Sequence, residues 1–354
     1  MKLPRRLVAG ASLFIAALVA APLFTWAQGQ YDARPMKLPW RIAFVRDKNI
    51  HLMKGDGSEQ KAWRSFGNVQ GRLTWSPDGR QLAWSRSGEN QYQLPDGGGG
   101  ARRLYDLFRA EVDSTREGYW RWITWNHGSR SPDWSADGKY IVYTRDMNAN
   151  QVDAELPDYQ IEYSNLDGTE VHRLTRQGAK PGECQGVDPA WSPDGTRIAF
   201  VYCKRTQEEP KVVDASQIQS AGGGSPLQLA GLVIAPITGI TATEAELEAQ
   251  AKRAPDVAVP TWSPNGQWIA YVSSVKTDGG IYIMSPDTGA KKKIFAKTDR
   301  IVPMQGQVSW SPDSKWLLFA TIDGFIYVVD SEGTQRPQRL TSGGNDYYPA
   351  FAPR

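Results

Sequence analysis

The sequence is poor in the residues that build most metal and thiol sites, with only two Cys and three His among 354 residues. This scarcity argues against multi-cysteine zinc sites, and we expect neither a metal nor another cofactor. The chain also has little net charge, because it contains 41 Lys and Arg and 38 Asp and Glu. It has no long basic block. Nucleic-acid binding needs a concentrated basic surface that displaces counterions from phosphates, so we expect no nucleic-acid partner.

Acidic residues are absent from the first 27 residues, where three basic residues precede an apolar stretch over positions 7–24. A basic start, an apolar stretch and a small-residue exit are typical of a secretory signal peptide. We therefore predict a signal peptide over 1–27, a short linker over 28–39, and a periplasmic or secreted protein. The apolar stretch is also close to the length of a membrane span, so an uncleaved N-terminal anchor is the alternative.

The rest of the chain contains an internal repeat whose core is a Trp-Ser-Pro-Asp-Gly motif with at most one change per copy. The five copies begin at Trp75, Trp134, Trp191, Trp262 and Trp310, and a degenerate sixth copy begins at Phe351. Pro presets the first turn position and Gly accepts a positive φ, so each copy predicts a tight turn between two antiparallel strands. Because the Trp recurs at a fixed place, we expect it to fill the space between adjacent repeats.

Each repeat has room for four strands, which predicts an all-β fold, a six-bladed β-propeller of four-stranded blades over residues 40–354. Residues 347–351 form a first strand with nothing after it, whereas residues 41–63 supply strands two to four with nothing before them. The N- and C-terminal segments are therefore expected to pair and close the ring, which removes open sheet edges. Insertions are expected at 106–130 and at 204–256, the second with a short helix.

The motif repeats come with Asp-Gly turns and Arg-Leu-Thr segments, as in Asp167-Gly168, His172-Arg-Leu-Thr175 and Gln338-Arg-Leu-Thr341. Together they resemble the WD-like propeller repeats of the TolB family, which also occur in propeller domains attached to prolyl-oligopeptidase-type peptidases. The resemblance implies an exported propeller that binds a partner protein at its channel mouth, as TolB binds the peptidoglycan-associated lipoprotein. Only about a dozen residues separate Ala27 from the first predicted strand, so the α/β domain that precedes the TolB propeller is expected to be missing.

Residues three to five positions before each motif aromatic are expected to converge at the channel mouth, because innermost propeller strands start there. With His127, which lies just before a first strand, the predicted partner- or ligand-binding residues are Arg72, His127, Arg130, Asp188, Gln307, Asp346 and Tyr347. The set mixes both charges with hydrogen-bonding groups, which suits a polar peptide, a loop of an envelope protein or a glycan. A water-filled pore is the alternative. A lone His does not make a metal site.

Three tryptophans outside the repeat, Trp120, Trp122 and Trp125, form a second candidate site. Trp120 and Trp122 share one face if this segment is a strand, and they could stack on a sugar or grip a peptide. The alternative is a hydrophobic patch that seals the loop onto its own blade.

The two cysteines, Cys184 and Cys203, flank the turn at Asp194-Gly195, which folds the chain so that they lie nearly opposite each other. In an oxidising exported compartment such a pair predicts a disulfide.

Residue patterns for catalysis are not found in the sequence. A serine-hydrolase elbow needs Gly-x-Ser-x-Gly, and the nearest segment, Gly223-Gly-Ser-Pro-Leu227, lacks the last Gly. We therefore expect a monomeric, non-enzymatic protein-interaction scaffold of the bacterial cell envelope. The alternatives are a carbohydrate-active lyase or hydrolase that uses channel carboxylates such as Asp188 and Asp346, and a glycan-binding propeller.

Overall fold

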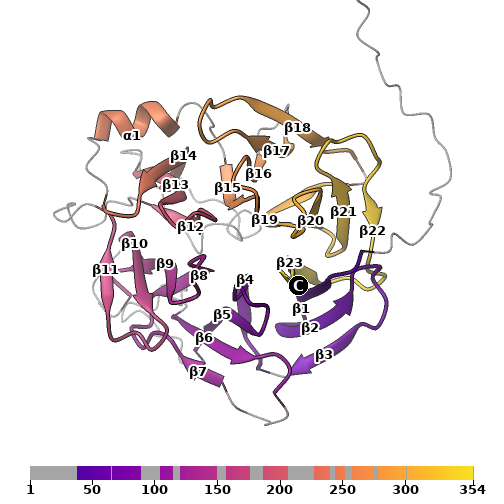
Figure 1. The fold of residues 1–354 in the computed structure, drawn as a ribbon, viewed down its shortest axis with the longest axis horizontal. Helices are drawn as coiled ribbons and strands as arrows, with labels where there is room; N and C mark the ends of the chain where they lie inside the picture. The colour runs from indigo at the N-terminus through magenta and orange to yellow at the C-terminus, as the bar shows by residue number, and fades with distance from the viewer. Residues whose placement is uncertain are drawn as a thin grey trace, which may run out of the picture. The chain divides into compact units, whose positions relative to one another are not determined.

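The computed structural model describes residues 38–64, 66–88, 104–114, 120–149, 157–175, 186–205, 227–239, 244–251, 257–273, 278–299 and 301–353. Within these residues the chain forms six antiparallel sheets arranged as a ring (Figure 1), so the predicted all-β, six-bladed β-propeller is confirmed.

The strands of each sheet follow one another outward from the centre of the ring. The first sheet takes strands from both ends of the described chain, in the order β23 (Asp346–Phe351), β1 (Arg41–Arg46), β2 (Asn49–Lys54) and β3 (Lys61–Arg64). The second sheet contains β4 (Val69–Trp75), β5 (Gln81–Ser87), β6 (Tyr105–Glu111) and β7 (Trp120–Trp122). The third contains β8 (Ser129–Trp134), β9 (Tyr140–Asp146), β10 (Tyr159–Asn165) and β11 (Val171–Arg173).

The remaining three sheets complete the circle. The fourth has only β12 (Val187–Trp191), β13 (Arg197–Arg205) and β14 (Leu227–Pro236). The fifth contains β15 (Val257–Trp262), β16 (Ile269–Ser273), β17 (Gly280–Met284) and β18 (Lys291–Ala296). The sixth contains β19 (Pro303–Trp310), β20 (Trp316–Thr321), β21 (Ile326–Asp330) and β22 (Gln338–Arg339).

The ring is closed by the predicted pairing of the two chain ends. Strand β23 pairs antiparallel with β1, and the register places Phe351 opposite Ile42 and Asp346 opposite Arg46. The innermost strands contact one another in the order β4, β8, β12, β15, β19 and β23, and β23 contacts β4 again. Each innermost strand therefore has a neighbour on both sides around the axis.

The fourth sheet departs from the predicted four-strand pattern. A helix, α1 (Glu244–Ala251), packs on β14 where the other sheets have a fourth strand (Figure 1). The segment contains only Ala, Glu, Leu and Gln, which are strong helix formers. Ala251 is fully buried against the sheet, and Gln250 Oε1 accepts a hydrogen bond from the Ile234 N–H at 3.4 Å. The helix thus covers the outer edge of β14. The short helix predicted for this segment is confirmed.

The described residues of the range 106–130, which we expected to be an insertion, include blade strands instead. They contain most of β6, all of β7 and the first two residues of β8. In the second expected insertion, 204–256, the structure places the end of β13, all of β14 and α1, and residues 206–226 lie outside the described part.

The five motif turns share one hydrogen-bond pattern. In the first, Ser76 Oγ donates to Asp78 Oδ1 at 2.6 Å and accepts the Gln81 N–H at 2.9 Å. The same bonds recur in the other four turns, with the amide oxygen of Asn265 replacing a carboxylate in one of them. In the fourth sheet, the motif serine hydroxyl and a main-chain N–H lower the pKa of Asp194 to about 2.

These turns lie together at one face of the ring. Gly138 approaches Pro77 of the preceding turn, and the Asn265 N–H donates to Ser314 Oγ of the following turn at 3.2 Å. We call this face the turn face. The innermost strands begin at the opposite face, which we call the loop face.

Six hydrophobic clusters form the core, and each lies mainly between two neighbouring sheets. Each holds one motif aromatic, which packs against the preceding sheet and confirms the predicted packing role. Three indole N–H groups also donate to main-chain oxygens of that sheet: Trp75 to Ala350, Trp262 to Ala190 and Trp310 to Thr261, at 3.1–3.2 Å. Trp134 Nε1, in contrast, is buried without a hydrogen-bond partner in the described part of the chain.

This difference between two equivalent tryptophans predicts unequal costs for the same substitution. Trp310→Phe leaves the Thr261 oxygen without its donor, whereas Trp134→Phe removes a donor that has no acceptor. We expect Trp310→Phe to lower the free energy of unfolding by about 1 kcal/mol more than Trp134→Phe, as measured by urea denaturation. Equal losses in the two variants would show that the indole hydrogen bond does not stabilise the contact between sheets.

Candidate functional site

All six innermost strands are irregular shortly before the motif aromatic. The ladder register shifts there in every sheet, as it does between Arg130 and Asp133. Four non-glycine residues three positions before the aromatic have positive φ: Ser131 (54°), Asp188 (53°), Val259 (42°) and Tyr348 (52°). Positive φ is unfavourable for residues with a Cβ, above all for a β-branched one, and such strain tends to concentrate at functional sites.

The position three residues before the motif aromatic therefore has the same special backbone in most repeats. We call its six occupants the axial ring: Arg72, Ser131, Asp188, Val259, Gln307 and Tyr348. Within it, the Ser131 hydroxyl donates to Asp188 Oδ1 at 2.6 Å, which joins neighbouring strands β8 and β12.

Arg72 and Gln307, both predicted to bind a ligand, tie the innermost strands together. Arg72 is 4% exposed and donates from Nη1 to the Pro189 oxygen at 2.6 Å and from Nη2 to the Pro260 oxygen at 3.2 Å. Gln307 is 6% exposed and bonds both the N–H and the oxygen of Leu73, at 3.1 and 2.7 Å. These bonds connect β4 with β12, β15 and β19 across the centre of the ring (Figure 1). Side chains rather than an open pore therefore span the axis at this level.

Arg130 and Asp188 lie together on the loop-face side of these ties and are half-buried. The Arg130 guanidinium lies 4.2 Å from the ring centroid of Tyr159. Burial acts to lower the pKa of Arg130, but the charges of Tyr159, Asp188, Tyr105 and Asp146 outweigh it and raise that pKa above its usual value.

Three further half-buried side chains surround this pair. The Tyr105 hydroxyl donates to Gln70 Oε1 at 3.0 Å. Burial, together with Tyr105 and Asp188, raises the pKa of Tyr348 to about 12, so its phenol stays neutral at neutral pH. We call the five residues Gln70, Tyr105, Arg130, Asp188 and Tyr348 the axial cluster. It combines a cation, a carboxylate and neutral hydrogen-bonding groups.

His127 precedes β8 at the loop face, with its side chain 50% exposed. Its Nδ1 lies 2.8 Å from Asp106 Oδ2, and its main-chain N–H donates to Asp106 Oδ1 at 2.9 Å. Burial raises the pKa of Asp106 despite these bonds. One imidazole and one carboxylate do not complete a metal site, and no group of three metal-ligating side chains occurs among the described residues.

Asp346 is fully buried, and its carboxylate does not reach the surface. It accepts two hydrogen bonds from Arg46, from Nε at 2.5 Å and from Nη2 at 2.8 Å. Tyr347, next in the chain, is half-buried, and burial raises its pKa. The structure therefore gives Asp346 a role in ring closure, and it does not present Asp188 and Asp346 together as an accessible carboxylate pair.

The tryptophans of the second candidate site lie at the outer edge of the second sheet. Trp120 and Trp122 stand in β7, with ring centroids 5.0 and 4.3 Å from that of Phe108 on β6. They pack on their own sheet, as the patch alternative expects. Trp125 is 67% exposed, and its ring lies 6.3 Å from that of Trp122.

Cys184 lies outside the described residues. Its predicted partner, Cys203, is fully buried near the end of β13 in the core shared by the fourth and fifth sheets.

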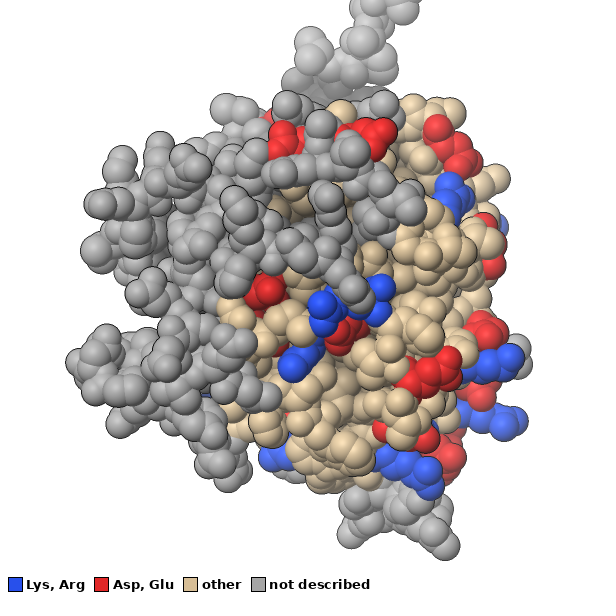
Figure 2. All heavy atoms as spheres, turned by 90° about the vertical axis from the view of Figure 1, so that its left-hand side faces the viewer, with Lys and Arg blue, Asp and Glu red and all other residues tan. Residues whose placement is uncertain are grey.

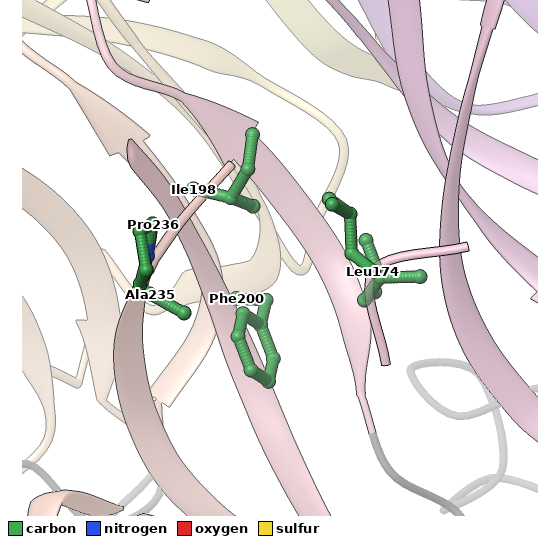
Figure 3. Close-up of a pocket in the computed structure, with 6 residues that line it drawn as sticks. Leu174, Ile198, Phe200, Ala235 and Pro236 are labelled. Atoms are coloured by element: carbon green, nitrogen blue, oxygen red, sulfur yellow. The ribbon is translucent and has the colours of Figure 1, made fainter. Parts of the chain in front are cut away.

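A small recess between the third and fourth sheets offers no polar chemistry. Its lining is Ile161, Leu174, Ile198, Phe200, Ala235 and Pro236 (Figure 3). All six are apolar, and none belongs to the axial cluster, so we assign the recess to core packing.

The side of the molecule in Figure 2 carries mixed charge. Among the described residues there, Lys and Arg lie beside Asp and Glu rather than in areas of one sign. Ion pairs within and between sheets also bring opposite charges together, as Arg197 with Asp287 at 2.9 Å and Arg173 with Glu162 at 3.4 Å. This side therefore offers no concentrated basic surface among the described residues.

Sequence reasoning found Arg130 and Asp188 but missed Gln70, Tyr105 and Tyr348. A signal for Tyr348 was present, because it occupies the same place before its motif aromatic as Asp188 does. It lies within the three to five positions expected at the channel mouth, but only the backbone bulge, with its positive φ, distinguishes it from its neighbours. Tyr105 starts a third strand, and only the folded ring brings it beside β4 and β23.

The ring of six sheets, closed by strands from both ends of the described chain, defines a six-bladed β-propeller whose fold is similar to that of TolB proteins. Among solved structures, the fold is similar to TolB from Acinetobacter baumannii, with a TM-score of 0.61 and 18% identity over 90% of this chain and 68% of that one. It is also similar to a protein assigned as TolB from Agrobacterium tumefaciens, with a TM-score of 0.53 and 14% identity over 87% of this chain and 90% of that one. A chain of the nidogen–laminin complex gives a TM-score of 0.54 at 13% identity, covering 88% of this chain and 98% of that one.

Comparison by sequence finds a partial relative. Over 135 residues the chain is 31% identical to a Bacillus subtilis protein described as uncharacterized peptidase YuxL. The match covers 37% of this chain and 16% of that protein. No family model matches the chain. The structural likenesses establish the fold, whereas the chemistry of the site depends on its own residues.

The ion pair of the fully buried Asp346 with the half-buried Arg46 predicts a stability effect. Asp346→Ala leaves the Arg46 cation without its partner, so we expect the free energy of unfolding to fall by roughly 3 kcal/mol in urea denaturation. The control is Asp113→Ala, which breaks the exposed pair with Arg41, where the side chains are 41% and 73% exposed. Loss of this exposed pair should cost at most about 1 kcal/mol. Similar costs for the two variants would contradict a closing role for Asp346.

Proposed function

We propose that this protein is an exported TolB-like propeller that acts as a non-enzymatic interaction scaffold in the bacterial cell envelope, and that it binds a partner protein at the loop face. The observation that carries the proposal is the axial cluster, in which Arg130, Asp188 and two tyrosines lie half-buried around strained backbone. Arginine and tyrosine are enriched among residues that dominate binding energy at protein interfaces. The hydrogen bonds of Arg72 and Gln307 cross the axis on the turn-face side of the cluster. We therefore propose that the partner binds at the loop face and does not pass through the ring.

The proposal includes export through a signal peptide over residues 1–27, which lie outside the described part of the chain. The basic and apolar pattern of that segment supports it. A periplasmic location follows from the TolB-like fold by analogy. In the part of the chain that the structure describes, no helix is long and apolar enough to cross a membrane.

A disulfide between Cys184 and Cys203 belongs to the same proposal. These are the two cysteines of the sequence, so the denatured protein should show no free thiol before reduction and two after it. Cys203→Ser should lower the free energy of unfolding by roughly 3 kcal/mol, the stabilisation expected for a loop of this length. Two reactive thiols in the protein isolated from the envelope would overturn the disulfide.

Site-specific photo-crosslinking tests where the partner binds. Ile322 is 64% exposed in the turn between β20 and β21, beside the start of β23 at the loop face. Lys139, whose side chain is 75% exposed, lies on a motif turn at the turn face. We expect a benzoylphenylalanine at position 322 to capture an envelope protein in living cells, because this position is exposed on the loop face, where we propose that the partner binds.

The same probe at position 139 is the matched control and should give at least about tenfold less of the same product. Excess protein without the probe should compete for the capture at position 322. Equal capture from both faces, or none from position 322, would remove the basis for loop-face binding.

A further inference from the structure

Arg130 has hydrogen-bonding capacity that the described residues do not use. A guanidinium carries five N–H donors and no acceptor. Arg130 Nε is buried without a hydrogen-bond partner, and no ion pair or hydrogen bond to its other nitrogens occurs in the described part of the chain. Its only close ring contact there is with the face of Tyr159. Buried donors normally have acceptors, so the Arg130 guanidinium, which has no acceptor among the described residues, can donate to a group of a bound partner.

Asp188 offers the complementary acceptor on the neighbouring innermost strand. Its Oδ1 accepts the Ser131 hydroxyl at 2.6 Å, and its Oδ2 accepts no hydrogen bond from the described residues. Arg130 and Asp188 influence each other electrostatically but do not form an ion pair with each other. The axial cluster therefore presents donors on β8 and an acceptor on β12.

The charges around this pair decide what kind of group fits. A ligand carboxylate would meet the donors of Arg130, but Asp188 and Asp146 would repel it. A ligand ammonium would meet Asp188 but would be repelled by Arg130. Asp146 itself accepts the main-chain N–H groups of Asn148 and Asp158, both at 3.0 Å, so its charge is held in place. A neutral group with one acceptor and one donor satisfies both sides without repulsion.

A peptide group has this combination, because it carries one oxygen acceptor and one N–H donor. We propose that Arg130 and Asp188 bind an uncharged main-chain or amide peptide group of an extended partner segment, with Arg130 donating to its oxygen and Asp188 accepting its N–H. The phenol groups of Tyr105 and Tyr348 border the same place and add contact surface. This inference rests on the proposed function and specifies the chemistry of the bound segment: neutral, extended and rich in amides.

Fluorescence anisotropy with defined probes tests the proposal on the full-length exported protein. The probes are three fluorescein-labelled dodecapeptides in which Ala alternates with Asn, with Glu or with Lys, and an N-acetylglucosamine hexamer serves as competitor. We expect the Ala/Asn peptide to bind most tightly, with less than about a twofold change in affinity between about 50 and about 300 mM salt, because no net charge is paired. Arg130→Met and Asp188→Ala should each weaken its binding by roughly tenfold or more.

Two variants keep this test interpretable. Arg41→Met removes an exposed arginine near the turn face and should leave the affinity unchanged. Arg130→Lys keeps the positive charge but loses the planar donor fork, so it should bind nearly as weakly as Arg130→Met. Because Arg130 makes no hydrogen bond in the described part of the chain, both substitutions should leave the unfolding midpoint within a few degrees of the original.

Whether Arg130→Met and Asp188→Ala raise or lower the affinity for each peptide distinguishes the competing ligand classes. Preference for the Ala/Glu peptide, with Asp188→Ala strengthening it, would mean a carboxylate site and would overturn the proposal. Preference for the Ala/Lys peptide, with Arg130→Met strengthening it, would mean a cation site and would overturn it too. Binding of the hexamer alone, or of no probe, would also overturn it. Loop-face capture from position 322 is independent of these outcomes, so it tells failure of this inference from failure of the proposed function.

Discussion

The antiparallel pairing of β23 with β1 is the constraint on which the rest of the structure depends. It joins the two ends of the described chain in one sheet, with the ion pair of Asp346 and Arg46 where β23 begins. Without this pairing, β1 and β23 would each have an open edge, and β23 would lose its fixed position between β19 and β4. Tyr348 stands on β23, so its place beside Asp188 and Tyr105 also depends on closure. Ring stability and the candidate site are thereby coupled.

The backbone of the innermost strands explains why polar side chains gather at the axis. A regular strand alternates its side chains between two faces, and a bulge changes that alternation at one point. In this propeller the register shifts in all six innermost strands before the motif aromatic, and most of them have positive φ at the affected residue. Some of these positions serve stability, as Arg72 and Gln307 do with their bonds to main-chain oxygens and N–H groups. Others, notably Asp188 and Tyr348, remain half-buried beside Arg130.

The comparisons separate fold from function. The same architecture occurs in TolB proteins and in a chain of the nidogen–laminin complex, at sequence identities of 18% or less. What these comparisons show to be shared is the fold. The fold does not determine the chemistry of the axial cluster, which depends on its own side chains. Among these are one cation and one carboxylate that do not form an ion pair with each other.

The sequence alone determined the turns and the number of blades, because the contacts that form each turn are between residues close together in the chain. Each motif turn folds through hydrogen bonds within about six residues, so the motif alone predicts it. The aromatic residue that begins each motif marks the contact with the preceding sheet. The leftover first strand at Tyr347–Phe351 likewise predicted closure. The tertiary structure decided the rest, because the deciding contacts are distant in sequence. It buried Asp346 against Arg46, directed Gln307 to Leu73, and replaced the fourth strand of one sheet with α1. It also set the bulges that place Tyr348 beside Asp188, since a one-residue change in register exchanges the two faces of a strand.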